Sequence, residues 1–253
     1  MEAINFIAES KPLKEALKSA NLLKSLQFNT LISGEEGTGR HTLAAYMMPD
    51  APVVHADDPQ LYTQIENHPQ IVIDRLSAID SLSRLSQSVQ KHGTKVIAIA
   101  DDRFAQGGNE SFFSVRILLP PLRERVEDVP PLARKFMLEA MEMFGERETG
   151  EVSEPDLRTL DLSRNAFSLR RSVFLHYFAA RMGEEELLLL NEAYLSSKME
   201  EEEDIYRREL FLYEVPLIRA GTRRFKSQLK MSHAFGLNRN TLRKKITEWK
   251  EYL

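Results

Sequence analysis

A glycine-rich segment at 34–42 (GEEGTGRHT) has the composition of a phosphate-binding loop. Glycines let backbone N–H groups converge on phosphate oxygens, and the start of a following helix adds its dipole. Arg40 stands where such loops carry Lys, and His41 stands where they carry the hydroxyl that binds Mg²⁺. A glycine turn that binds no ligand is therefore the alternative. The predicted nucleotide-binding residues in this loop are Gly34, Glu35, Glu36, Gly37, Thr38, Gly39, Arg40, His41 and Thr42.

The stretch 230–249 has the pattern of a helix, a glycine turn and a second helix. Gly236 can adopt the left-handed conformation that ends the first helix, and Leu237 is expected to pack at the corner. Asn238 is a good N-cap for the second helix. Apolar residues define the two helices at a spacing of three to four residues: Leu229, Met231, Ala234 and Phe235 in the first, and Leu242, Ile246 and Trp249 in the second.

The second of these helices is basic on the side away from its apolar stripe, which is typical of a helix that reads DNA. Arg239, Asn240 and Arg243 are expected to reach base edges in a major groove. Phosphate contacts are expected from Arg223, Arg224, Lys226, Lys230 and Lys250. The other predicted DNA-binding residues are Asn238, Thr241, Lys244 and Lys245. The alternative is an ordinary surface helix with a solvated basic face.

Charge is unevenly distributed along the chain. Residues 216–253 contain ten Lys or Arg and two acids, a net charge of +8, which leaves −12 for the rest because the whole chain carries −4. This asymmetry favours a DNA-binding end attached to a body that does not bind DNA.

Composition excludes several other classes of site and location. The chain has no cysteine, which rules out disulfides, thiolate catalysis and cysteine zinc sites. Its six histidines show no close pairing of the kind a helical metal site needs, and each is interpreted as an ordinary surface or core residue. No Ser, His and Asp form a recognisable nucleophile turn. Without a signal peptide or a membrane-length apolar run, the protein is expected in the cytoplasm, away from membranes.

The first half of the chain alternates short β-rich runs with helical stretches. Strand-like runs occur at 28–33, 52–55, 70–74, 95–100 and 115–119, and helix-like segments at 13–26 and 42–48. This alternation predicts a parallel sheet covered by helices. From residue 120 onward the pattern is helical: Pro130 and Pro131 start one helix, and Glu154 and Pro155 another. Acidic runs at 184–186 and 200–204 flank four leucines, which favours a long connecting helix with a solvated charged face.

Several segments resemble, in the right order, the central AAA+ domain of sigma-54-dependent activators, the bacterial enhancer-binding proteins. ESKPLKEAL, GEEGTGRH, KVIAIADDRF and, most specifically, LLPPLRERVEDVPPLARKF (118–136) are similar to family segments, and the resemblance covers 6–174. AFSLRR stands where the family has GNVREL, which would make Arg170 a lid arginine that senses nucleotide. The end of the chain, LNRNTLRKKI, resembles the family's Fis-type helix-turn-helix.

The resemblance implies an α/β fold: an AAA+ P-loop parallel sheet with a helical lid, followed by an all-α Fis-type helix-turn-helix domain. The implied boundaries are a degenerate AAA+ core at 1–120, a helical lid at 121–183, a linker helix at 184–213 and the DNA-binding domain at 214–253. The implied cofactor is ATP or ADP with Mg²⁺, and Asp74 would hold the metal. The chain begins at the ATPase-like segment, so no sensory domain is expected ahead of it.

Several catalytic parts of the family are missing. The family's second acidic motif ends in Asp and Glu, but here Arg75 follows Asp74 and cannot orient the attacking water. Asp101 stands where the family has a sensor Asn, and 104–113 lacks the arginine fingers. The segment 43–73 contains nothing like the GAFTGA loop that contacts sigma-54, and a second family insertion is absent from 75–94.

These patterns together predict a bacterial transcriptional regulator that binds double-stranded DNA as a homodimer, joined through the helices around 205–218 or through the core, with at most nucleotide binding and no robust ATP hydrolysis. Other transcription regulators or RNA polymerase are further candidate partners. Two alternatives stay open: a divergent but active AAA+ ATPase that activates sigma-54 transcription, and a protein-docking platform for which DNA contact is minor.

Overall fold

The computed structural model of the protein describes residues 6–101, 104, 112–143, 157–199 and 203–253. The chain divides into two compact units, Met1–Arg181 and Met182–Leu253. Within the described residues, no helix combines the length and the apolar character needed to cross a membrane.

Five parallel strands form the sheet of the first unit. They are β1 (Thr30–Gly34), β2 (Val53–His55), β3 (Gln70–Asp74), β4 (Lys95–Ala100) and β5 (Val115–Leu119), in the order β2-β3-β4-β1-β5. The strands predicted at 70–74, 95–100 and 115–119 are confirmed residue for residue. The apolar composition of β3 and β4 reflects burial on both faces, as expected for a parallel sheet, whereas the edge strand β5 exposes Arg116 and Leu118.

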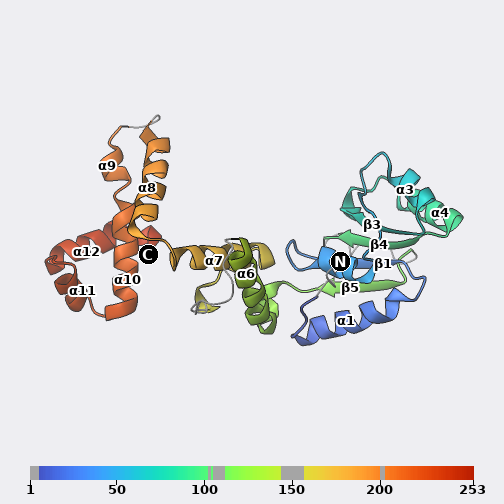
Figure 1. Ribbon diagram of the computed structural model, residues 1–253, viewed down its shortest axis with the longest axis horizontal. Helices are drawn as coiled ribbons and strands as arrows, with labels where there is room; N and C mark the ends of the chain where they lie inside the picture. The colour runs from blue at the N-terminus through green and yellow to red at the C-terminus, as the bar shows by residue number, and fades with distance from the viewer. Residues whose placement is uncertain (1–5, 102–103, 105–111, 144–156, 200–202) are drawn as a thin grey trace. The chain divides into compact units, whose positions relative to one another are not determined.

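Helices cover both faces of this sheet. Helices α1 (Lys11–Lys24) and α2 (Arg40–Met47) pack on one face, against side chains such as Ile32, Ile97 and Ile117. Helices α3 (Leu61–Asn67) and α4 (Leu82–His92) pack on the other, against Leu31 and Ile71. Figure 1 shows α1 on one side of the strands and α3 and α4 on the other. Alternate side chains of the central strands β1, β3 and β4 therefore supply two separate cores.

A short helical lid completes the first unit. After β5 come the 3-10 turns Leu122–Glu124 and Val126–Asp128, helix α6 (Val129–Met143), the turn Leu157–Thr159 and helix α7 (Asn165–Ala179). The two prolines predicted to start a helix lie in the first turn of α6, where their missing N–H groups have no intrahelical role. The helix predicted to start at Glu154 and Pro155 falls outside the described residues. The helices α6 and α7 share a core of Phe136, Leu169, Val173 and Tyr177.

The second unit is entirely helical in its described residues. It contains α8 (Glu184–Met199), α9 (Ile205–Arg208), α10 (Phe211–Phe225), α11 (Gln228–Ala234), α12 (Arg239–Glu248) and a final 3-10 turn (Lys250–Tyr252). The expected linker helix at 184–213 is divided among α8, α9 and the start of α10. Asp204 has a left-handed backbone, φ 61°, directly before α9. That conformation cannot continue a right-handed helix.

A small core joins α10, α11 and α12. Ile218, Met231 and Leu242 are buried at its centre, and Phe225, Phe235, Ile246 and Trp249 pack around them. Two residues expected to face this core do not: Leu229 is 54% exposed and Ala234 is exposed. The reason is that α11 has only seven residues and buries Met231 with its neighbour Ser232, whose hydroxyl donates to the Leu229 carbonyl.

Candidate functional site

The loop between β1 and α2 has the backbone geometry of an anion site. Gly34, Gly37 and Gly39 have φ of 148°, 76° and 102°, values that only glycine adopts without strain. The N–H groups of Gly37, Gly39, Arg40 and His41 form no hydrogen bond with the described residues. These donors, at the start of α2, are therefore available to phosphate oxygens.

The side chain of Arg40 is held by the protein itself. Its Nη1 donates to the carbonyl oxygen of Ala100 at 2.6 Å, at the end of β4. Strands β1 and β4 are parallel neighbours, so their carboxyl ends lie at the same edge of the sheet. The cation predicted to contact phosphate thus spans from the loop to the neighbouring strand.

Two histidines bind the carboxylate of Asp74. His41 Nε2 lies 3.1 Å from Asp74 Oδ1, and His55 Nδ1 lies 3.6 Å from Asp74 Oδ2. Burial by itself raises the pKa of this carboxyl. The opposite effect is larger: it comes from the hydrogen bond and charge of His41, the backbone N–H of Arg75 and the charge of His55, so the net pKa is below the usual range. His41 was a predicted site residue and His55 was not. The only sequence signal for His55 was its place at the predicted end of a strand.

The surroundings of Asp74 do not fit a Mg²⁺ site. Mg²⁺ prefers oxygen ligands in octahedral geometry, whereas imidazole nitrogens face both oxygens of this carboxylate. In the described part of the chain, no three His, Asp or Glu side chains are placed so that they could hold a metal ion. Asp74 therefore lacks the partners that its predicted metal-binding role requires.

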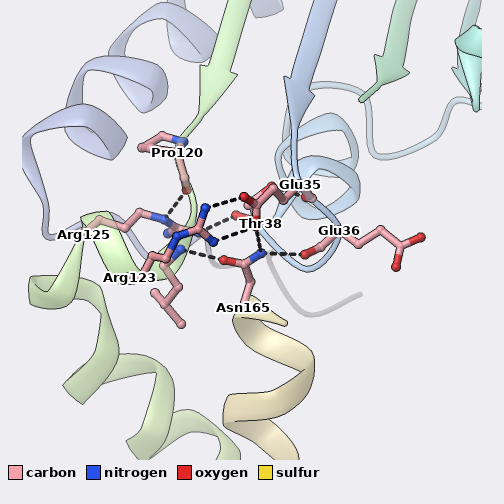
Figure 2. A network of polar contacts seen from close by, with 8 residues as sticks. Glu35, Glu36, Thr38, Pro120, Arg123, Arg125 and Asn165 are labelled. Carbon is pink, nitrogen blue, oxygen red and sulfur yellow. Dashed lines mark hydrogen bonds and ion pairs between the residues drawn. The ribbon is translucent and has the colours of Figure 1, made fainter. Parts of the chain in front are cut away.

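The lid is bound directly to the loop by hydrogen bonds, as Figure 2 shows. Arg123 donates to both carboxylate oxygens of Glu35, at 2.9 and 2.6 Å. Asn165, the first residue of α7, donates to Glu35 Oε2 at 3.1 Å and to the Glu36 carbonyl at 2.8 Å. The hydrogen bonds from Arg123, followed by those from Asn165, lower the pKa of the Glu35 carboxyl. Glu35 and Glu36, predicted to bind nucleotide, thus contact the lid.

Asn165 occupies a strained and buried position. Its φ is 53°, it is 1% exposed, and its Oδ1 accepts a hydrogen bond from the Leu122 N–H at 2.6 Å. An asparagine tolerates this backbone region better than most residues. Its side chain thereby joins the loop, the start of the lid and α7. Nothing in the local sequence marked this residue as part of the site.

Arg125 is a second buried connection between the lid and the loop. It donates to the Thr38 carbonyl at 2.6 Å, to the Pro120 carbonyl at 2.9 Å and to Asp128 Oδ2 at 3.2 Å. Asp128 also accepts from the backbone N–H and the hydroxyl of Ser10. Burial lowers the pKa of the Arg125 guanidinium, and Asp128 opposes that effect. The segment 118–136, whose sequence gave the most specific family resemblance, therefore has a structural role: it holds the loop in place.

A pocket of about 200 Å³ lies beside the loop. Its apolar lining includes Phe6, Leu13, Leu132 and Phe136, and Gly37, Thr38, Gly39 and Thr42 of the loop form part of its wall. Arg170, the predicted nucleotide sensor, also lines it and pairs with Glu139 at 2.9 Å.

The second candidate site is the outer face of α12. Gly236 has φ 65° at the turn between α11 and α12, and the Asn238 side chain accepts a hydrogen bond from the Thr241 N–H at 2.8 Å, so the predicted turn and cap are confirmed. Arg239, Arg243 and Lys244 are exposed and form no ion pair with the described residues. The other predicted DNA-binding residues that are exposed are Asn240, Arg223, Arg224, Lys226, Lys230 and Lys250.

Lys245 differs from its neighbours on α12. Its Nζ forms an ion pair with Glu214, a residue only 8% exposed on α10. The Trp249 indole N–H donates to the other oxygen of Glu214 at 2.7 Å. The structure thus places Lys245 in the packing between α10 and α12, away from the face that carries the other cations.

Comparisons with known proteins support the fold. No protein-family model matches the chain, and no curated protein matches it. The crystal structure of NtrX from Brucella abortus in complex with ATP aligns over 96% of this chain and 69% of that chain, with 14% identity and a TM-score of 0.54. The same protein in complex with ADP aligns over 97% and 69%, with 14% identity and a TM-score of 0.55. Similarity at this identity shows the fold alone, and it confirms a parallel α/β fold with a helical C-terminal part.

Proposed function

We propose that this chain is a cytoplasmic, DNA-binding transcriptional regulator of the bacterial enhancer-binding type whose AAA+ unit does not hydrolyse ATP robustly. The observation that carries the proposal is the outer face of α12. Three cations on a capped helix, Arg239, Arg243 and Lys244, are exposed and have no acidic partner among the described residues. Such a helix, preceded by a glycine turn, suits the major groove of double-stranded DNA.

The cations around α12 would divide the work of binding. Arg239 and Arg243, with Asn240, are positioned on the first two turns of α12, where side chains reach base edges. The exposed cations of α10 and α11 and the Lys250 side chain would contact phosphates, which fix orientation without reading sequence. Lys245 is left out of this set because Glu214 already pairs with it.

The P-loop site supports a regulator without robust turnover. Arg75 has a left-handed backbone, φ 52°, and an exposed side chain, where the resembled family has its water-orienting Glu. Between α2 and β3 the chain contains only β2 and α3, which supports the absence of a sigma-54-contacting loop. Most of the segment expected to lack arginine fingers, 105–111, lies outside the described residues.

Dimer formation through α8 is part of the proposal. No residue of α8 is buried, and its four consecutive leucines, Leu187 to Leu190, are 53–67% exposed. Exposed apolar residues that adjoin one another mark protein interfaces. Val215 and Ile218 of α10 are buried in their own unit and cannot serve this purpose. Two copies would match the two-fold symmetry of a palindromic site.

The DNA-binding proposal is tested by fluorescence anisotropy with duplex DNA across a salt series. The logarithm of the affinity should fall linearly with the logarithm of the salt concentration, by about 0.9 for each phosphate contact. Arg239→Ala should weaken binding to a selected site by about 1–3 kcal/mol. Absence of binding at low salt would reject the proposal and favour the protein-docking platform.

The hydrolysis part is tested by phosphate release with and without DNA. We expect no turnover above a no-enzyme control. Clear turnover that Asp74→Ala abolishes would establish the active ATPase alternative instead. The dimer is tested by light scattering: Leu188→Ser combined with Leu189→Ser should give a monomer, whereas Leu229→Ser, a change at another exposed leucine, should leave a dimer.

A further inference from the structure

We propose that the loop at 34–42 binds a nucleoside diphosphate and does so without Mg²⁺. This inference rests on the AAA+ nucleotide site of the proposed function and names its ligand. It departs from the nucleoside triphosphate and metal that the fold implies, because contacts within the protein occupy two parts of the site, the third-phosphate position and the Mg²⁺ position.

The backbone donors of the diphosphate position are intact. The backbone N–H groups of Gly37, Gly39, Arg40 and His41 form no hydrogen bond with the described residues, and they surround the start of α2. A P-loop cradles the first two phosphates with such backbone donors. Because these backbone hydrogen bonds need no side chain, they remain possible although Arg40 and His41 stand in place of the usual lysine and hydroxyl residue.

The position of a third phosphate is altered. In a P-loop the lysine reaches from the loop to the outer phosphates. Arg40 stands in that place and donates to the Ala100 carbonyl at 2.6 Å, across the carboxyl ends of β1 and β4. A third phosphate would have to displace this hydrogen bond, and its negative oxygens would then lie beside the Ala100 carbonyl oxygen. Both effects lower the affinity for a triphosphate relative to a diphosphate.

The position of Mg²⁺ is occupied by two imidazoles. The usual metal-binding hydroxyl is replaced by the His41 imidazole, which lies 3.1 Å from Asp74 Oδ1, while His55 lies 3.6 Å from Oδ2. Mg²⁺ would need to displace two imidazoles and would gain no oxygen ligand from His41. The charge of a bound diphosphate would instead be met by the loop N–H groups and the α2 dipole.

The adjoining pocket suits one flat ring system. It measures about 200 Å³, and its lining combines the aromatic and aliphatic side chains Phe6, Leu13, Leu132 and Phe136 with the cations Arg125, Lys135 and Arg170. Complete small-molecule sites occupy roughly 300–1,000 Å³, so this pocket would take the base alone and leave the phosphates at the loop.

The experiment is isothermal titration calorimetry on the full chain with ADP, ATP, AMP and pyrophosphate, each in Mg²⁺ and in EDTA. We expect ADP to bind equally in both buffers and ATP to bind no more tightly than ADP. AMP should bind about tenfold or more weakly than ADP, the effect of losing one or two hydrogen bonds to a charged group. Pyrophosphate should compete with ADP, since it uses the same N–H groups.

A variant that restores the metal-binding hydroxyl at position 41 tests whether His41 is the reason that the loop does not bind Mg²⁺. His41→Thr should free Oδ1 of Asp74, while His55 stays beside Oδ2, and should make ATP binding tighter in Mg²⁺ than in EDTA. The matched control is His92→Thr, at the end of α4 and the amino-terminal edge of the sheet, which should change nothing. Thermal denaturation checks that both variants are folded.

Three results would overturn the inference: tighter binding of ATP with Mg²⁺ than of ADP by the wild type, loss of ADP binding in EDTA, or no binding of any nucleotide. None of them bears on DNA binding, which anisotropy measures separately. Conversely, Arg239→Ala should weaken sequence-specific DNA binding and leave ADP binding unchanged, so failure of the two proposals can be told apart.

Discussion

The cations of the loop region and those of α12 are used in opposite ways. Arg40, Arg123 and Arg125 each donate to acceptors of the protein itself: a carbonyl, a carboxylate, or both. Arg239 and Arg243 have no such partner in the described part of the chain. Cations satisfied internally position the backbone, whereas cations left in solvent are available to an anionic partner. Sequence composition alone does not distinguish the two groups.

The largest expected effect is at the buried pair of the loop region. Arg125→Ala would leave Asp128, which is fully buried, without its ion pair. Breaking such a pair costs about 3–5 kcal/mol. Arg123→Ala, two residues away, removes a pair whose Arg side chain is 52% exposed and should cost far less. Calorimetric unfolding of the first unit measures both, and equal losses would contradict the division between buried and exposed cations.

The next largest expected effect is a difference in unfolding free energy between two lysine variants of α12. Lys245→Met would leave Glu214 buried without its ion pair and should cost the second unit about 1.5–3 kcal/mol. Lys244→Met should change its stability by less than about 0.5 kcal/mol. Trp249 is the single tryptophan, so its fluorescence during urea unfolding reports this unit.

In DNA binding the order of the two variants should reverse, with Lys244→Met having the larger effect on affinity and Lys245→Met the smaller. Lys244→Met should reduce the salt dependence of binding by about one unit of slope. Equal salt slopes for wild type and Lys244→Met would show that Lys244 does not contact phosphate.

A smaller effect is expected at the cap of α12. Asn238→Ala removes the hydrogen bond to the Thr241 N–H and should cost about 1 kcal/mol in the same urea experiment. Asn240→Ala, on an exposed residue of the first turn, should leave stability unchanged and weaken DNA binding. A loss of stability at Asn240 as large as at Asn238 would count against the separation of capping from DNA contact.

The smallest effect concerns pH. The pKa of Glu35 is lowered in the folded protein by Arg123 and Asn165, so its contribution to stability is fully present above the ordinary carboxyl pKa of about 4.3. That contribution is lost as the pH falls through the lowered folded-state pKa. The stability difference between wild type and Glu35→Gln should therefore shrink below about pH 4. A constant difference from pH 6 to pH 3 would show that the ion pair does not hold the lid.

The regular elements were predictable because their signals are local. Strand runs such as 70–74 and 95–100 are short and apolar, and their composition alone predicted the bounds of β3 and β4. Gly236 and Asn238 carry backbone and capping preferences that act within three residues. The single helix predicted across 184–213 is wrong, because α8 ends at Met199 and Asp204, before α9, has a left-handed backbone that nothing in the local composition indicates.

The contacts of the site were predictable only in part. The loop and Asp74 were recognised from residue type and spacing, but Asn165 reaches Glu35 from 130 residues away in sequence. The inward direction of Lys245 depends on Glu214, 31 residues earlier. Partners at such separations are chosen by the fold, so a reading of neighbouring residues cannot identify them.

The sequence by itself determined that this protein has a phosphate-loop α/β unit and a basic, capped helix near its end, because glycine, proline, apolar spacing and charge act locally. Only the tertiary structure decided which charges remain free. In the loop, Arg40 donates to the Ala100 carbonyl and His41 pairs with Asp74, on neighbouring strands. Arg239 and Arg243 instead face solvent. The physical reason is that a side chain pairs with the acceptors that lie within its reach, and the positions of those acceptors exist only in the folded chain.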